Sequence, residues 1–142
     1  MRQFTFPVTL TPDGQDGGFV VTSRDVPELV TEGNTIADAL EAAEGALEAA
    51  IEARIEDGLD IPLPTRHKED EHRVGLPIGT AMKAALYQAM REQGVSKVEL
   101  ARRMALDEKE ARRMLTPRHA TKVPTLERAL HVLGKRVELV VS

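Results

Sequence analysis

The sequence contains no cysteine and no tryptophan, and aromatic residues make up only 3% of it. The missing thiols exclude disulfide bridges, thiolate zinc sites, iron–sulfur clusters and a cysteine nucleophile. The few aromatic rings argue against a stacking platform for single-stranded nucleic acid. No apolar run approaches the roughly 20 residues of a membrane-spanning helix, and the N-terminus lacks the apolar core of a secretory signal. We therefore expect a cytoplasmic protein with no membrane partner.

The 142 residues have the composition of an ordered protein, but their charge is unevenly distributed. Residues 1–65 carry 3 basic and 13 acidic side chains, a net charge of −10, whereas residues 66–142 carry 16 basic and 10 acidic side chains, a net charge of +6. Such asymmetry suggests two modules with different partners. Prolines and a polar run mark the boundary, so we expect a first domain at 1–65, a linker at 66–78 and a second domain at 79–142.

The first module is predicted to fold as β-β-β-α. Alternating apolar residues and turn signals predict strands at residues 4–10, 19–22 and 29–31. A helix is expected to begin near Thr35, which forms a possible capping box with Asp38, and to end at Gly58. The outer face of this helix is acidic and carries Glu41, Glu44, Glu48 and Glu52.

The second module is predicted to be helical, with helices at residues 80–93, 96–104, 107–115 and 125–133. Val137, Leu139 and Val140 then indicate a short terminal strand, and we expect it to pair with or pack against a second copy of the chain. The predicted fold class is therefore α+β, a β-β-β-α domain followed by an all-α domain with a short terminal strand.

Residues 97–116 have the pattern of a helix-turn-helix, in which two short helices meet across a turn of three or four residues. The inner face is apolar, and Ala101 supplies the small residue needed where the helices cross. Ala105 stands where the turn usually has glycine, because φ is often positive there. A left-handed alanine costs about 1–2 kcal/mol, so this residue is the one departure from the pattern.

The second helix of this motif is the predicted reading helix, because its cations point away from the buried side. Cations in that position suit the phosphates and guanine edges of a major groove. Glu108 and Glu110 argue the other way, since carboxylates in a groove repel phosphate. The predicted DNA-binding residues lie on both helices and in the following loop: Lys97, Lys109, Arg112, Arg113, Thr116, Arg118 and Lys122.

Four segments in this order resemble the HicB antitoxin family: MRQFTFPVTLTPDGQDGGFVVTSRDVPELVTEGNTIADALEAA, IPLP, ELARRM and RHATKVPTLERALHVLGKRVEL. The resemblance covers nearly the whole chain. It implies a first domain with a partial ribonuclease H fold that binds and blocks a HicA toxin, a small basic ribonuclease. It further implies a λ-repressor-like second domain that binds the operator and represses the operon, and self-association as a dimer or higher even oligomer.

The resemblance also accounts for the charge asymmetry, since an acidic module suits a basic toxin and a basic module suits DNA. The toxin contacts are assigned only to the acidic module as a whole, and the residues expected to make them are Asp13, Asp16, Asp25, Glu28 and Glu32.

A ribonuclease H-like nuclease and a ligand-sensing regulator are the two alternative functions. A ribonuclease H-like enzyme needs carboxylates that converge on two metal ions, whereas Asp13, Asp16 and Asp25 lie in turns, so we expect no catalytic residues. The polar run around His67 and His72 has no neighbouring residues that would orient metal ligands, and we expect neither a metal nor a cofactor. The alternative that stays open is a stand-alone ligand-sensing regulator, although a 65-residue module barely fills its own core.

Overall fold

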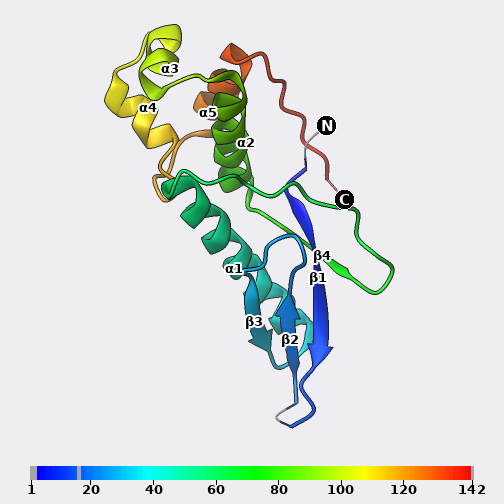
Figure 1. The fold of residues 1–142 in the computed structure, drawn as a ribbon. Helices are drawn as coiled ribbons and strands as arrows, with labels where there is room; N and C mark the ends of the chain where they lie inside the picture. The colour runs from blue at the N-terminus through cyan, green and yellow to red at the C-terminus, as the bar shows by residue number, and fades with distance from the viewer. Residues whose placement is uncertain (1–2, 16, 142) are drawn as a thin grey trace. The chain divides into compact units, whose positions relative to one another are not determined.

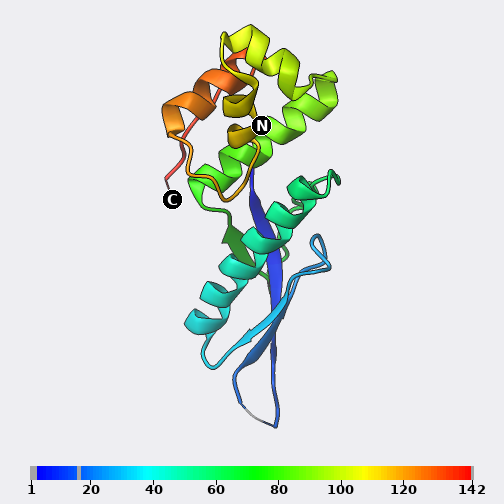
Figure 2. The same ribbon diagram turned by 90° about the vertical axis from the view of Figure 1, so that its left-hand side faces the viewer.

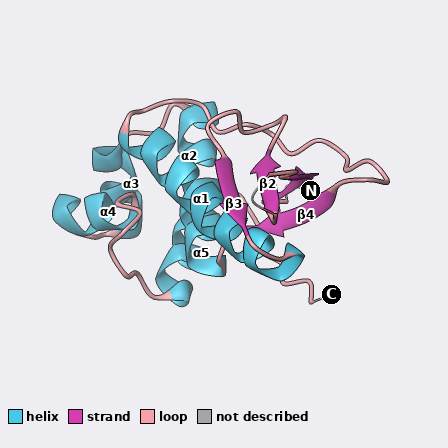
Figure 3. Ribbon diagram, turned by 90° about the horizontal axis from the view of Figure 1, so that it is seen from below, coloured by secondary structure: helices cyan, strands magenta, loops and turns pink. Residues whose placement is uncertain are grey.

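A computed structural model describes residues 3–15 and 17–141, and the chain divides into two compact units. The first unit comprises Met1–Arg54 and Pro62–Pro77, and the second comprises Ile55–Ile61 and Ile78–Ser142. The strands lie in the first unit, whereas the second unit is helical (Figure 3). The predicted α+β class is therefore confirmed.

The first unit is built on a four-stranded antiparallel sheet with the strand order β3-β2-β1-β4 (Figure 1). Phe6 of the first strand lies opposite Val74 of the last, and Leu10 lies opposite Val21. The three predicted strands are present, and a fourth joins them along the outer edge of the first. The bounds are β1 (Thr5–Pro12), β2 (Phe19–Thr22), β3 (Val30–Gly33) and β4 (His72–Gly75).

Helix α1 (Ile36–Glu56) runs along one face of this sheet (Figure 2). Phe6 and Val8 of β1 are fully buried, as predicted, but Pro7 between them is buried as well and Leu10 is only half-buried. The helix contributes Ala43, Leu47 and Ile51, which are also fully buried. Ile36 lies at the first residue of the helix and is 47% exposed.

The turn from β3 into α1 leaves no room for a side chain at Gly33, where an added Cβ would lie 2.3 Å from Ala39 N. Because the three atoms nearest to this Cβ all belong to the backbone of Asp38 and Ala39, Gly33→Ala is expected to destabilise the first unit by about 1–3 kcal/mol. Gly45→Ala is the matched control, since no atom lies within 4 Å of its added Cβ and alanine favours the helix. Urea unfolding followed through amide signals of the first unit measures both, and an equal effect of the two substitutions would contradict this packing.

The segment predicted as a linker is instead largely part of the first unit, which includes Pro62–Pro77. Strand β4 pairs with β1 over four residues, from Thr5 opposite Gly75 to Val8 opposite His72. The sequence indicated a linker with at most a short extended piece near Val74, because only Val74 among the four residues of β4 is apolar and buried, so no alternation marks a strand.

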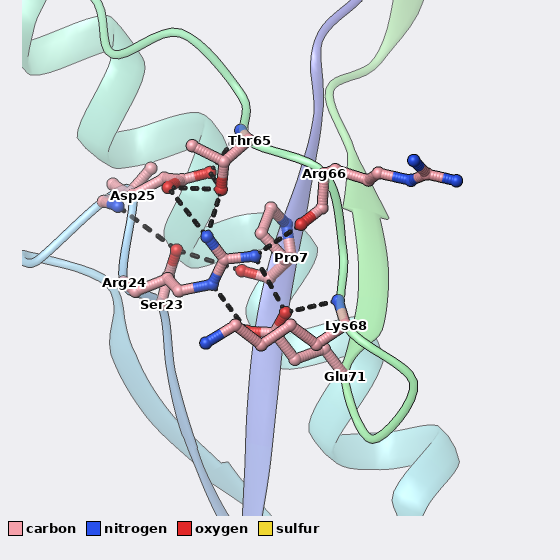
Figure 4. A network of polar contacts seen from close by, with 9 residues as sticks. Pro7, Ser23, Arg24, Asp25, Thr65, Arg66, Lys68 and Glu71 are labelled. Atoms are coloured by element: carbon pink, nitrogen blue, oxygen red, sulfur yellow. Dashed lines mark hydrogen bonds and ion pairs between the residues drawn. The ribbon is translucent and has the colours of Figure 1, made fainter.

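Arg24 holds the stretch before β4 against the sheet (Figure 4). Its guanidinium donates from Nε and Nη2 to the Glu71 carboxylate, at 2.9 Å each, and from Nη2 to the Arg66 carbonyl at 2.6 Å. Its Nη1 also donates to the Thr65 hydroxyl, and the Thr65 amide donates to Asp25 at 2.7 Å. The hydrogen bond from Arg24 lowers the pKa of Glu71 to about 2. Residues 65–71 are thus fixed by a charged network, which is why they need no apolar periodicity.

The second unit contains four helices over the described residues, α2 (Ile78–Gln93), α3 (Lys97–Met104), α4 (Glu108–Met114) and α5 (Val123–Val132). Apolar side chains from all four share one core, which includes Leu86, Leu100, Met114 and Leu126. Residues 55–61 belong with this unit because α2 binds them. Tyr87 donates its hydroxyl to the Leu59 carbonyl at 2.8 Å, and Arg91 pairs with Asp60 at 2.7 Å.

The predicted terminal strand is wrong, since residues 135–141 form neither helix nor strand. A strand needs a hydrogen-bonded neighbour, and the second unit offers none in the described part of the chain. Val137 packs partly against the helical core, whereas Leu139 and Val140 are each 73% exposed. Leu139, Val140 and Val141 form an apolar tail that is exposed among the described residues.

Candidate nucleic-acid interface

Helices α3 and α4 form the predicted pair of short helices, joined by a tight turn. Ala105 ends α3 in the left-handed conformation, with φ 54° and ψ 43°, and it is the one non-glycine residue with positive φ in the described chain. The amide of Leu106 donates to the Ala101 carbonyl at 2.9 Å and closes the turn. The departure from glycine thus leaves the geometry of the turn intact.

Local caps fix where each helix begins and ends. Ser96 accepts a hydrogen bond from the Glu99 amide at 3.1 Å, and Asp107 accepts one from the Lys109 amide at 3.3 Å. Serine and aspartate are both among the residues preferred at the N-cap of a helix. At the other end of α3, Arg128 of α5 donates to the Met104 carbonyl at 2.6 Å. A cation at this position suits the negative end of the helix dipole.

Helices α3 and α4 each have one buried face and one exposed face, as the periodicity of the sequence predicts. Ala101, Met104, Ala111 and Met114 are buried in the core of the second unit. The seven predicted DNA-binding residues are all exposed: Lys97, Lys109, Arg112, Arg113, Thr116, Arg118 and Lys122. They lie at the start of α3, along α4 and in the loop before α5. Exposure leaves them accessible to DNA, and their role in binding stays a prediction.

Ion pairs distinguish among these exposed cations. Arg112 pairs with Glu108 across one turn of α4 at 2.6 Å, so part of its charge is compensated. Lys109 and Arg113 form no ion pair with any other described residue. The strongest positive field on α4 therefore comes from Lys109 and Arg113.

Helix α3 carries two further arginines that the sequence analysis did not select. Glu99 accepts hydrogen bonds from Arg102 at 2.5 Å and from Arg103 at 3.0 Å. These bonds lower the pKa of Glu99 to about 2, so it stays ionised at neutral pH. Because one carboxylate is shared by two guanidinium groups, α3 keeps a net positive surface beside Lys97.

The five predicted toxin contacts fall into different environments. Asp13 lies in the β1–β2 turn and accepts from the Gln15 amide at 3.3 Å, while Asp16 lies outside the described residues. Asp25 is bonded to Thr65, and Glu28 pairs with Arg54 at 2.6 Å, which lowers the pKa of Glu28. Glu32 is exposed on the edge strand β3. Asp25 and Glu28 are therefore engaged within the unit, whereas Glu32 is exposed and forms no ion pair among the described residues.

One charged residue near this surface escaped the sequence analysis. Lys83 of α2 is only 2% exposed and reaches the end of α4. A signal existed, because Lys83 is in helical phase with the buried Leu86 and Met90, at spacings of three and seven. A lysine in an apolar stripe indicates a buried charge that must have partners.

Two other kinds of site find no support in the described residues. No group of three or more histidine, aspartate or glutamate side chains there is arranged to hold a metal ion. Among the helices of residues 3–15 and 17–141, none combines the length and hydropathy needed to cross a membrane.

Comparison with known proteins gives one consistent match. Residues 5–85 match the model of a family described as the HicB-like antitoxin of bacterial toxin–antitoxin systems. Antitoxin HicB of Escherichia coli (strain K12) is 38% identical over 135 residues, which cover 95% of this chain and 97% of that protein. Antitoxin HicB 1 of Photorhabdus laumondii is 34% identical over 98% of this chain and 88% of that protein.

Antitoxin HicB of Pseudomonas fluorescens (strain Pf0-1) is 33% identical over 96% of this chain and 94% of its own length. The similarity therefore extends through the sheet and through helices α3 and α4 alike. On these grounds the chain belongs to the HicB-like family of antitoxins from bacterial toxin–antitoxin systems.

Proposed function

We propose that this antitoxin acts in the cytoplasm, binds and inhibits a HicA-type mRNA-cleaving toxin and represses its own operon by binding the operator. The observation that carries the proposal is the match between charge and fold. Residues 1–65, with a net charge of −10, supply most of the first unit, and residues 66–142, with a net charge of +6, contain the helix-turn-helix. No catalytic residue is assigned, and inhibition follows from binding alone.

Electrostatic complementarity supports the first half of the proposal. A small basic ribonuclease carries the positive surface that binds RNA, so an acidic partner competes for that surface and speeds association. Exposed carboxylates such as Glu32 on β3 and Glu41 and Glu44 on α1 provide the negative surface. We expect these residues, rather than the engaged Asp25 and Glu28, to face the toxin.

The helix-turn-helix supports the second half. Two capped helices, an apolar inner face and an exposed row of cations are the features that place a reading helix in the major groove. The test is fluorescence anisotropy with a duplex from upstream of the gene and with an unrelated duplex, each at two salt concentrations. We expect tighter binding to the upstream duplex, with about 0.9 in the salt slope for each phosphate contact. Equal affinity for both duplexes would remove operator binding from the proposal.

A ligand-sensing regulator is the second candidate function, favoured by the same helix-turn-helix. The two functions differ in the neighbouring reading frame. A short basic frame beside this gene supports the antitoxin, whereas a metabolic gene supports the sensor.

Self-association is expected to depend on the apolar tail. Operators read by two helix-turn-helix units have half-sites about 34–36 Å apart, which requires at least a dimer. Leu139, Val140 and Val141 are exposed by 73%, 73% and 84%, and a second copy of the chain would cover them. Replacing Leu139 and Val140 with glutamate should therefore weaken the dimer at least tenfold, since each buried side chain contributes about 1.5–3 kcal/mol.

Light scattering over a range of micromolar concentrations measures this effect. Arg136→Gln is the matched control, because it changes a polar residue of the same tail. A monomeric mass for the unchanged protein would contradict the expected self-association.

A further inference from the structure

Lys83 is the one charged residue in the described chain that is buried as completely as the core, with 2% of its surface exposed. It projects from α2, which lies outside the helix-turn-helix pair. Its ammonium contacts three backbone carbonyls, those of Arg113 at 3.2 Å, Thr116 at 2.6 Å and His119. These carbonyls follow one another at intervals of three residues, from the last turn of α4 into the loop beyond it.

The same segment is a run of consecutive turns. The Thr116 amide donates to the Arg113 carbonyl at 3.1 Å, and the His119 amide donates to the Thr116 carbonyl at 3.1 Å. Each turn alone is weak, since a single such hydrogen bond contributes only about 0.5–1.5 kcal/mol. The ammonium joins the turns into one unit, because its three donors match three convergent acceptors.

Charge adds to this geometry. The last carbonyls of a helix carry partial negative charge, so a cation there is stabilised and in turn stabilises the helix end. A buried ammonium is costly unless its donors are satisfied, so the lysine and the turns require one another. The end of α4 and residues 116–119 are therefore fixed from behind, on the side away from the exposed cations.

We propose that Lys83 is a positioning residue for operator binding, which holds Arg113 and Arg118 in a fixed mutual arrangement before DNA arrives. The inference rests on the proposed operator binding and extends it to a residue that DNA does not touch. Arg113 lies at the end of α4 and Arg118 lies in the loop, and the lysine binds the backbone of the segment that carries both cations. A protein that must order this loop on binding loses affinity, since ordering side chains and loops costs free energy.

The test is a pair of double-mutant cycles in the full chain, with affinity for the upstream duplex as the readout. Lys83→Met keeps the length of the side chain but removes its donors. We expect it to lower affinity roughly tenfold, and we expect its effect to be smaller in an Arg118→Ala background, because coupled residues are not additive. Lys97→Ala is the matched background, since it removes an exposed cation that Lys83 does not hold, and there the two effects should multiply.

Three results would overturn the proposal. The first is wild-type affinity for Lys83→Met. The second is a Lys83→Met effect that multiplies with both Arg118→Ala and Lys97→Ala, because that would indicate a loss of stability alone. Hydrogen exchange of the unchanged protein gives a check that needs no folded variant, since the amides of Thr116 and His119 should be protected without DNA. Exchange at those two amides as fast as in an open loop would exclude a segment fixed in advance.

Failure of the proposed function looks different in the same experiment. If the unchanged protein does not prefer the upstream duplex, operator binding itself is excluded. If it does prefer that duplex and Lys83→Met changes nothing, only the positioning role is excluded.

Discussion

Replacing Arg113 with alanine is expected to weaken operator binding by roughly fivefold to more than a hundredfold, the effect of about 1–3 kcal/mol for one bidentate contact to guanine. Lys109→Ala should act in the same direction, because neither cation is paired within the described chain. Arg112→Ala should have the smallest effect of the three, since the ion pair with Glu108 already compensates part of its charge. At least one of the three substitutions should relax base preference at a defined operator position.

Affinity measured over a set of operator variants at two salt concentrations separates the roles. A base contact changes the preference at one position, whereas a phosphate contact lowers affinity for every sequence and flattens the salt slope. Glu110→Gln is a control that should change affinity in the opposite direction. It removes an exposed negative charge from the same helix and should raise affinity for all duplexes. Wild-type affinity for all three alanine variants would show that α4 is not the reading helix.

A fragment of residues 1–77 is expected to neutralise the toxin, whereas a fragment of residues 1–65 should lose nearly all activity. The shorter fragment ends before β4 and so removes the partner of β1 and the buried Val74. It also removes Glu71, the carboxylate that binds Arg24. A unit of this size has only about 3–5 kcal/mol of stability to lose, so these deletions should unfold it.

Circular dichroism of both fragments and rescue of growth from co-expressed toxin measure this difference. The result also locates the domain boundary, which composition placed after residue 65 and the structure places after Pro77. Rescue by the shorter fragment equal to that of the longer one would contradict the role given to β4.

Local signals made the two short helices α3 and α4 and the turn between them predictable. Ser96 and Asp107 act as caps through their own side chains, and the left-handed Ala105 follows from the spacing of the motif. Each of these features depends on neighbours within about four residues. The sequence therefore contained both the elements of this unit and the exposed positions of its cations.

Features that depend on distant partners could not be read in the same way. Strand β4 exists because His72–Gly75 meets β1 more than 60 residues earlier, and the Arg24 network joins residues 40 or more apart. The apolar tail shows the opposite error, since Val137, Leu139 and Val140 alternate like a strand but have no strand beside them. Alternating apolar residues indicate that one face of a segment will be buried. A strand forms only where another strand is available to pair with that segment.

The central claim is that one unit neutralises a toxin while the other reads DNA. Its most direct measurement is co-expression with the product of the reading frame next to this gene, scored by growth and by co-purification. The full chain should restore growth and purify with that product, and the variant with alanine at Lys109, Arg112 and Arg113 should do both equally well while it no longer binds the upstream duplex. A full chain that neither restores growth nor co-purifies would contradict the account, as would loss of rescue in that variant.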